Sequence, residues 1–153
     1  MFSKACEYAL RAVIFIYIKG VNGARLSIPE IAKEIDAPLA YTGKILQTLT
    51  REGVIASVKG PNGGFFVDPQ AKAVTLADVV KAMYGNDDVL HTCVLGLKEC
   101  SDKFPCPIHA QVKGYRDHVR KVMENTTIRS LVNDLSKGRT FLKNVRQRKS
   151  FRK

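Results

Sequence analysis

The sequence predicts a mainly α-helical fold with one small β-hairpin and a long C-terminal helix, and three observations support this fold class. Apolar residues recur at helical spacing in Ser3–Ile18, Thr75–Tyr84 and Ile108–Val122. Two more short helical patterns flank residues 36–38, and two β-prone runs enclose a glycine-rich turn at residues 59–64. With 153 residues, 45% of them hydrophobic, the chain is long enough to bury a core of its own.

The first expected helix, Ser3–Ile18, carries one apolar stripe and ends before Gly20. Its uninterrupted apolar run, Ala12–Ile18, is far shorter than the ~20 residues that a membrane-spanning helix needs. No small-residue cleavage site follows it, as a signal peptide would require. We therefore expect a cytosolic (cytoplasmic) protein with no membrane segment, in which the four cysteines are thiols or metal ligands rather than disulfides.

Residues 27–52 predict two short helices joined by a tight turn. Ser27 and Glu30 are spaced as a capping box, and the first helix stops at residues 36–38 because the residue before Pro38 resists the helical conformation. The second helix is expected from residue 39 to about residue 52, with a small and polar start, as insertion into the major groove of DNA requires. The expected DNA contacts are Ser27 and the outward-facing Ala40, Tyr41, Thr42, Lys44 and Gln47.

The two β-prone runs, Val54–Val58 and Phe65–Val67, enclose a segment that contains Asn62-Gly63, a strong hairpin signal. No acidic residue lies between residues 53 and 67, so this hairpin is locally positive. Its glycines would let backbone N–H groups approach phosphates or the minor-groove floor. Residues 1–84 therefore predict a winged helix-turn-helix DNA-binding domain. Its expected wing contacts are Lys59, Gly60, Asn62, Gly63 and Gly64.

A loop over residues 85–107 contains Cys93, Cys100 and Cys106, and His109 follows three residues after the last cysteine. Prolines bracket Cys106 and place it at the start of a helix, where the helix dipole favours a thiolate. His109 projects one turn further along the same face. Thiolates and an imidazole suit an iron–sulphur cluster or zinc, so this loop predicts a sensor site.

The last structured region, residues 108–136, predicts a long helix followed by a short return helix. Its apolar positions step by four, three, four and three from Ile108 to Val122, a narrow seam that is typical of a helix packing against its own symmetry mate. A basic, disordered tail is expected at residues 137–153, which hold eight Lys and Arg residues and no acid. The tail is either solubilising or an accessory phosphate-binding arm. Because the remainder has a surplus of only three positive charges out of the net +11, charge alone does not identify a DNA-binding protein.

Three segments resemble the IscR/NsrR-type family of bacterial winged helix-turn-helix transcription regulators: Ser3–Ala12, Tyr41–Leu46 and Val58–Phe65. The resemblance covers roughly residues 1–136. It implies a homodimer that crosses its long C-terminal helices on a dyad-symmetric DNA operator and acts as a repressor. It also implies an iron–sulphur cluster, with two irons favoured over four, held by the three loop cysteines and by His109 or by Glu7 of the partner subunit. Gly43 departs from the larger polar residue that many members carry, which leaves the operator class open.

Other assignments remain open at this stage. Three cysteines and a histidine also satisfy structural zinc, although the tight Cys-x2-4-Cys pair usual in zinc sites is missing. The cysteines could instead be redox-active or inert free thiols, in a regulator, a cluster carrier or a cysteine-based redox enzyme. We expect no enzyme, because no nucleophile motif, phosphate loop or paired carboxylate frame is present. Nitric oxide, redox state and cluster supply are all possible signals. Cys6, His91 and His118 are expected to be packing or solvated residues rather than ligands.

Overall fold

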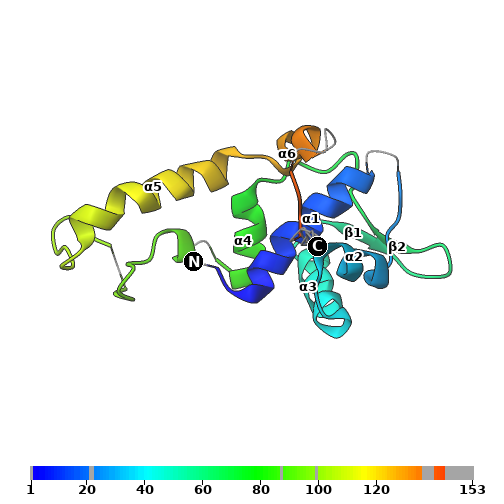
Figure 1. The fold of residues 1–153 in the computed structure, drawn as a ribbon, viewed down its shortest axis with the longest axis horizontal. Coiled ribbons are helices and arrows are strands. Elements are labelled where there is room, and N and C mark those ends of the chain that lie inside the picture. Colours follow the sequence, from blue (N-terminus) through cyan, green and yellow to red (C-terminus); the bar gives the residue numbers. More distant parts are fainter. Residues whose placement is uncertain (1, 21–22, 87, 99, 136–139, 144–153) are drawn as a thin grey trace, which may run out of the picture.

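The computed structural model describes residues 2–20, 23–86, 88–98, 100–135 and 140–143. The predicted fold class, mainly helical with one small hairpin, is confirmed. Figure 1 shows most elements gathered in one body, from which the long helix α5 extends. The elements in chain order are α1 (Lys4–Gly20), α2 (Ile28–Ile35), α3 (Leu39–Arg51), β1 (Ala56–Val58), β2 (Gly64–Phe66), α4 (Leu76–Tyr84), the short 3-10 helix η1 (Asp88–Leu90), α5 (His109–Asn125) and α6 (Ile128–Leu135).

Local sequence signals set the helix boundaries of the helix-turn-helix. Ser27 and Glu30 form the predicted capping box at the start of α2, with each side chain bonded to the other residue's backbone N–H. Asp36 ends α2 in the left-handed conformation, at a φ of 52°. Pro38 precedes α3 in an extended conformation. The turn between the two helices is therefore short and defined, as the sequence predicts.

The wing is a two-stranded antiparallel hairpin in which Ala56 pairs with Phe66. Its turn differs from the expected Asn-Gly turn, because the N–H of Gly63 donates to the carbonyl of Gly60 at 3.0 Å. The centre of this turn is Pro61-Asn62, and proline suits its first central position because its φ is fixed near −65°. Val54 and Ile55, predicted as strand residues, instead precede β1 as part of the buried core.

The main core surrounds α1, which packs against α2, α3, α4, α6 and β2. Ile128 and Val132 of α6 lie in this core, so the short return helix is held against the winged helix-turn-helix. Among the described helices, even the apolar α1 is neither long nor hydrophobic enough to cross a membrane. The expectation of a disordered tail falls mostly on residues outside the described ones, which include only residues 140–143 of that segment.

A second, smaller core joins the start of α1 to α4, η1 and α5. Cys6 is fully buried there beside Val80 and Leu90, with Met123 of α5 packed against them. Burial raises the pKa of the Cys6 thiol to about 11. Cys6 is a packing residue, as the sequence indicated, and this cluster fixes the end of α5 nearest the main body.

We predict that Ile128→Ala lowers the free energy of unfolding by about 2–5 kcal/mol, because it leaves a cavity where a fully buried side chain joins α6 to the main core. Urea unfolding at one fixed protein concentration measures the change. Exposed Arg129 is the matched position, and Arg129→Ala should change the value by no more than about 0.5 kcal/mol. Equal small effects at both positions would mean that α6 is not part of this core.

Candidate nucleic-acid interface and cysteine loop

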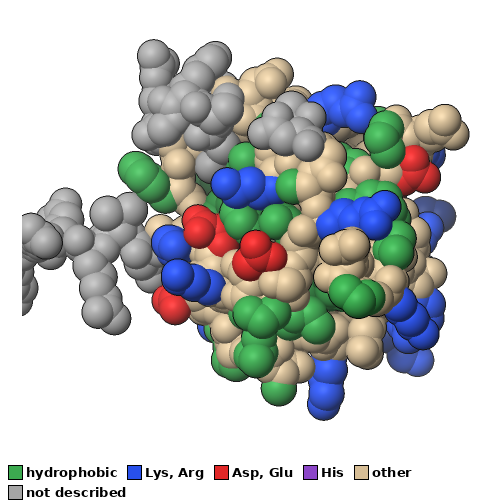
Figure 2. All heavy atoms as spheres, turned by 90° about the vertical axis from the view of Figure 1, so that its right-hand side faces the viewer, with side chains coloured by type: hydrophobic (Ala, Val, Ile, Leu, Met, Phe, Trp, Pro, Cys, Tyr) green, Lys and Arg blue, Asp and Glu red, His purple; other side chains and the backbone are tan. Residues whose placement is uncertain are grey.

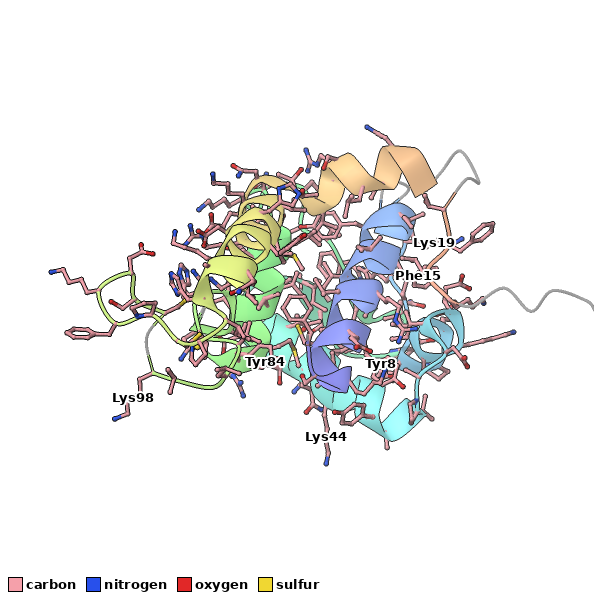
Figure 3. The ribbon with its side chains drawn as sticks, turned by 60° about the vertical axis from the view of Figure 1, so that its left-hand side comes forward. Tyr8, Phe15, Lys19, Lys44, Tyr84 and Lys98 are labelled. Carbon is pink, nitrogen blue, oxygen red and sulfur yellow. The ribbon has the colours of Figure 1, made fainter. Side chains whose placement is uncertain are left out.

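The start of α3 presents an exposed surface. Ala40, Tyr41, Lys44 and Gln47 are all exposed, as predicted for residues that read base edges. Figure 3 shows Lys44 pointing away from the neighbouring helices. Leu39, which the sequence analysis did not select, is 55% exposed at the first position of this helix. An apolar side chain here is suited to contact a thymine methyl group.

Thr42 was predicted to face outward, and this prediction is wrong. Its side chain is fully buried, and its hydroxyl donates to the carbonyl of Pro38 at 2.9 Å. Thr42 lies on the same helix face as the buried Ile45, Leu46 and Leu49, at spacings of three, four and seven residues. It therefore anchors the first turn of α3 and has no surface to offer to DNA.

Two residues of α1 support α3 and the turn before it. The Arg11 guanidinium donates to the carbonyl of Ile35, at the end of α2, at 2.8 Å. It also lies over the Tyr8 ring, 4.8 Å from its centre. The Tyr8 ring meets Tyr41 edge to face, with the ring centres 5.9 Å apart, and Figure 3 shows Tyr8 beside the start of α3. These contacts join α1, α2 and α3 at the exposed start of α3.

The supporting role of Arg11 and Tyr8 was not predicted from the sequence. Helical periodicity places both residues on a half-exposed face but does not predict which side chains or carbonyls they contact. The segment that contains both, Ser3–Ala12, was one of the three segments that carried the family resemblance. The resemblance therefore marked this segment as important but did not predict the contacts of Arg11 and Tyr8.

The wing exposes Lys59, Gly60 and Asn62, consistent with the predicted contacts, although DNA binding itself remains a prediction. Arg25 supports the wing. Its guanidinium donates to the carbonyl of Asn62 at 3.2 Å and lies 5.5 Å from the centre of the Phe66 ring. The Arg25 side chain therefore contacts both the turn and the second strand of the wing. These two contacts of Arg25 hold the wing in place.

Gly63 and Gly64 have a structural reason to be glycine. A Cβ on Gly63 would collide with the carbonyl oxygen of Val58, and one on Gly64 would lie 2.8 Å from that of Leu26. Gly64 also has a φ of 146°, which favours glycine. The close approaches within the hairpin therefore account for both residues. Gly60 has open space around its Cβ position, so it alone of the three leaves room for an approaching phosphate.

Charge is spread over the end of the molecule that carries the wing. Figure 2 shows Lys and Arg side chains at separate places on this face rather than in one patch. Ser27, at the start of α2, is exposed, but its hydroxyl donates to a Glu30 carboxylate oxygen at 2.6 Å. Glu30 therefore lies beside the predicted contact. The exposed cations at the predicted contacts are Lys59 and Lys44.

The four predicted metal ligands lie near the start of α5, in two pairs. The Cys100 sulphur is 3.2 Å from Nδ1 of His109, whose Nε2 lies 2.8 Å from a carboxylate oxygen of Asp102. Buried Cys93 is in hydrogen-bond contact with Cys106. The backbone N–H of Leu95 lowers the pKa of Cys93, with a smaller contribution from the Cys106 side chain.

The described residues contain no set of three or more Cys, His, Asp and Glu side chains arranged to hold a metal ion. The single four-ligand set expected from the sequence is therefore present only as two pairs. Glu7, the alternative ligand, lies on α1 and pairs with Lys4 at 2.7 Å. That hydrogen bond lowers the pKa of Glu7. Its use as a ligand requires the partner subunit, as the resemblance implied.

The contacts of Arg116 indicate whether an anionic group fits beside the cysteines. Its guanidinium is in hydrogen-bond contact with Cys100 and bonds Asp117 at 3.1 Å, while its Nε is buried with no hydrogen-bond partner among the described residues. A hollow of about 820 Å³ adjoins Cys100 and is lined also by Arg120. Buried N–H groups without partners are rare. Three soft sulphur donors, an imidazole and an unpaired N–H fit an iron–sulphur cluster, whose sulphurs accept such bonds.

The predicted seam of α5 lies on the surface of the described chain. Tyr115 is 78% exposed and Val122 is 44% exposed, although both belong to the apolar face. Val112 and Val119 line an apolar groove of about 510 Å³. An apolar helix face with a groove along it is an unusual surface for a monomer and fits a second helix.

Comparison with known proteins identifies the family. The model of the Rrf2 family, described as an iron-dependent transcriptional regulator, matches residues 2–134. The chain belongs to the Rrf2 family. One relative of this Rrf2 protein, from Aquifex aeolicus and carrying the name of an HTH-type transcriptional regulator, is 30% identical over 136 residues, which are 87% of this chain and 92% of that protein. The regulator IscR of Cronobacter sakazakii is 25% identical over 128 residues, covering 84% of this chain and 77% of IscR.

The fold comparison agrees with the family. The solved structure of CymR, the global cysteine regulator of B. subtilis, superposes on the Rrf2 protein with a TM-score of 0.69 at 23% identity, covering 88% of this chain and 97% of CymR. At this identity the likeness shows the winged-helix fold alone. The family and its named relatives are transcriptional regulators, so the Rrf2 protein is a regulator and not an enzyme.

We predict that Arg11→Ala lowers the free energy of unfolding by about 1–3 kcal/mol, because it removes a charged hydrogen bond and a cation–π contact. It should also reduce discrimination between DNA sequences, since Tyr8 and Tyr41 lose their support. Chemical unfolding and competition binding measure the two effects. Arg11→Lys is the control: it keeps the charge but not the planar guanidinium, so full rescue by lysine would contradict the stacking argument.

A second prediction concerns pH. Hydrogen bonds from Lys113 and Arg116 lower the pKa of Asp117 from 3.8 to about 2. A lowered pKa in the folded state stabilises the fold above the unfolded pKa, and this contribution is lost as pH falls through the folded one. The difference in urea midpoint between wild type and Asp117→Asn should therefore be constant above about pH 5 and shrink between pH 4 and 2. A difference that grows on acidification would contradict the pairing.

Proposed function

We propose that this Rrf2 protein is a homodimeric repressor, acting in the cytoplasm, whose affinity for a dyad-symmetric DNA operator is set by an iron–sulphur cluster in the loop at residues 85–107. One observation carries the DNA-binding part: α3 exposes Leu39, Tyr41 and Lys44 near its start, while Tyr8 of α1 packs against Tyr41 and Arg11 of α1 bonds the end of α2. A rigid helix with exposed side chains at its N-terminal end is the arrangement that reads the major groove.

The two parts of the interface have different roles in this proposal. Side chains of α3 read base edges and set sequence preference, whereas the wing and the start of α2 contact the phosphate backbone. Thr42 has no part in it because it is buried. The proposed base-reading residues are Leu39, Ala40, Tyr41, Lys44 and Gln47, and the proposed backbone contacts are Ser27, Lys59, Gly60 and Asn62.

Dimerisation through α5 is supported by its exposed apolar seam and by the groove beside it. In the dimer, the two DNA-binding domains must contact half-sites about one helical turn apart, roughly 34 Å, so the pair of α5 helices sets the distance between these domains. Because the cysteine loop leads directly into α5, gain or loss of the cluster would change that distance. This connection is the proposed route from sensor to operator.

For the cofactor, we propose Cys93, Cys100 and Cys106 as ligands, with His109 as the fourth and Glu7 of the partner subunit as the alternative. Support comes from the two contact pairs at the start of α5 and from the unpaired N–H of Arg116. When bound, a cluster supplies a redox-sensitive, nitric-oxide-sensitive centre that also links the loop to α5. Two irons are proposed rather than four. Zinc and free thiols are the alternatives that the experiment below separates.

Lys59→Ala tests the wing. Loss of one phosphate contact should weaken binding to every sequence and reduce the slope of log affinity against log salt by about 0.9. The probe is a fluorescent duplex about three helical turns long, first of random sequence and then the sequence selected from that pool. Gln47→Ala is the comparison variant, for which sequence preference should change while the slope stays the same. If Lys59→Ala leaves the slope unchanged, the wing assignment is wrong.

Val119→Glu tests the dimer. A charge buried in the α5 seam costs several kcal/mol, so this variant should dissociate at micromolar concentration in sedimentation experiments. Lys121→Glu places the same charge on the opposite face of α5 and should leave the dimer intact. A wild-type protein that sediments as a monomer would end the proposal.

Anaerobic reconstitution with iron and sulphide tests the cofactor. The protein should gain visible absorption that Cys93→Ala and Cys106→Ala together abolish, with two irons and two sulphides per site by analysis. A colourless protein in which metal analysis finds zinc retained from purification would favour the structural-zinc alternative. Comparing His109→Ala with Glu7→Ala, by spectrum as well as by DNA affinity, identifies the fourth ligand. A colourless product without bound metal would leave only the free-thiol alternative.

A further inference from the structure

Arg116 borders both cysteine pairs near the start of α5. It follows His109 by seven residues, which is two helical turns further along the same face. Its side chain lines the hollow that adjoins Cys100 and also the apolar groove that adjoins Cys93. Only 15% of this side chain is exposed. A positive charge is therefore held, largely out of water, beside sulphur atoms of both pairs.

The hydrogen-bond donors of Arg116 are only partly used. A guanidinium carries five N–H donors and no acceptor. Asp117 accepts from one of its nitrogens at 3.1 Å, and Cys100 is in hydrogen-bond contact with the group. The Nε atom is buried and has no partner among the described residues. Because a buried donor without a partner destabilises a fold, this arrangement favours an acceptor that the described chain does not supply.

The charge of Arg116 is also incompletely neutralised. Its carboxylate partner among the described residues, Asp117, is shared with Lys113 at 3.1 Å and with Arg120 at 3.8 Å. One carboxylate therefore faces three cations. Two other carboxylates approach this group, at 3.9 Å from Lys113 and at 4.0 Å from Arg120, and neither pairs with Arg116. An anionic group beside Arg116 would add the charge that this set lacks.

We propose that Arg116 sets the reduction potential of the iron–sulphur cluster, by donating its unpaired Nε–H to a sulphur atom and by placing its charge beside the cluster. This inference rests on the proposed cofactor and extends it. Cluster potentials respond to nearby charge and to hydrogen bonds on the sulphurs. Uptake of one electron adds one negative charge, so a cation and a donor stabilise the reduced form more than the oxidised form. Arg116 therefore raises the potential.

This role makes Arg116 a residue of regulation. Half of the protein is reduced when the ambient potential equals that of the cluster, so Arg116 would set the redox condition at which operator affinity changes. Arginine suits this role better than lysine, because the guanidinium stays charged when buried and presents its donors in a fixed plane.

Arg116→Gln tests the inference in the full chain, reconstituted anaerobically with iron and sulphide. The change removes the charge and the Nε–H and keeps a polar side chain. Reduction by dithionite with redox mediators, at one fixed pH, is followed by the loss of visible absorption. The equilibrium constant for one-electron reduction should fall at least tenfold, a drop of about 59 mV in potential. Iron and sulphide contents and the spectrum of the oxidised protein should stay the same, because no ligand is lost.

Two further variants separate charge, donor and structure. Arg120→Gln removes the same charge one turn further along α5, from a side chain that contacts His91 at 3.3 Å, so it should lower the potential less. Arg116→Lys keeps the charge without the Nε–H, so its potential should lie between those of wild type and Arg116→Gln. If Arg116→Gln does not retain the cluster, the potential of Arg116→Lys alone decides the question and should lie below that of wild type.

The inference is overturned if Arg116→Gln has the wild-type potential, or if Arg120→Gln lowers the potential equally. A lysine variant at the wild-type potential would show that charge alone acts and would overturn the role of the Nε–H. If the wild-type chain acquires no cluster, the proposed cofactor fails and this inference fails with it. A wild-type cluster whose potential does not respond to Arg116 overturns the inference alone and leaves the proposed cofactor intact.

Discussion

The buried face of α1 is the constraint on which the other elements depend. This helix packs against both helices of the helix-turn-helix, against α4 and α6, and against the second strand of the wing. Fully buried Val13 and Ile16 and the small Ala9 and Ala12 let those elements approach closely. Since α1 contacts both α3 and the wing, a change in its packing would move these two elements together. The half-exposed Arg11 and Tyr8 extend the same control to the turn before α3.

The cysteine loop at residues 85–107 has a different physical character. Its side-chain contacts around the start of α5 are polar or charged: Arg116 links Cys100 to Asp117, and His109 links Cys100 to Asp102. Burial there is partial, since Cys100 and Cys106 are half-buried whereas Cys93 is buried. The main body and this loop meet at α5, which contacts both.

Much of this arrangement could be predicted from the sequence because local signals specify it. The capping box at Ser27 predicted the start of α2, and apolar spacing predicted α1, α4 and α5. The errors have identifiable physical causes. Thr42 is polar, yet its position three residues before Ile45 puts it on the buried face. The hairpin turn is centred on Pro61-Asn62 rather than on Asn62-Gly63, because the N–H of Gly63 bonds to the carbonyl of Gly60. Spacing predicted four metal ligands but could not show that these residues lie in two pairs, Cys100 with His109 and Cys93 with Cys106.

The fourth cysteine has a consequence for how opening of this protein can be followed. The reactive form of a thiol is the thiolate, and Cys6 is fully buried with a pKa of about 11. A water-soluble alkylating reagent at neutral pH therefore reaches Cys6 only when the junction between α1, α4 and α5 opens. The half-exposed sulphurs of Cys100 and Cys106 need no such opening. Mass spectrometry of the four cysteines over time would thus separate movement of the loop from opening of the core within one sample. The rate of Cys6 alkylation would report the opening of the core.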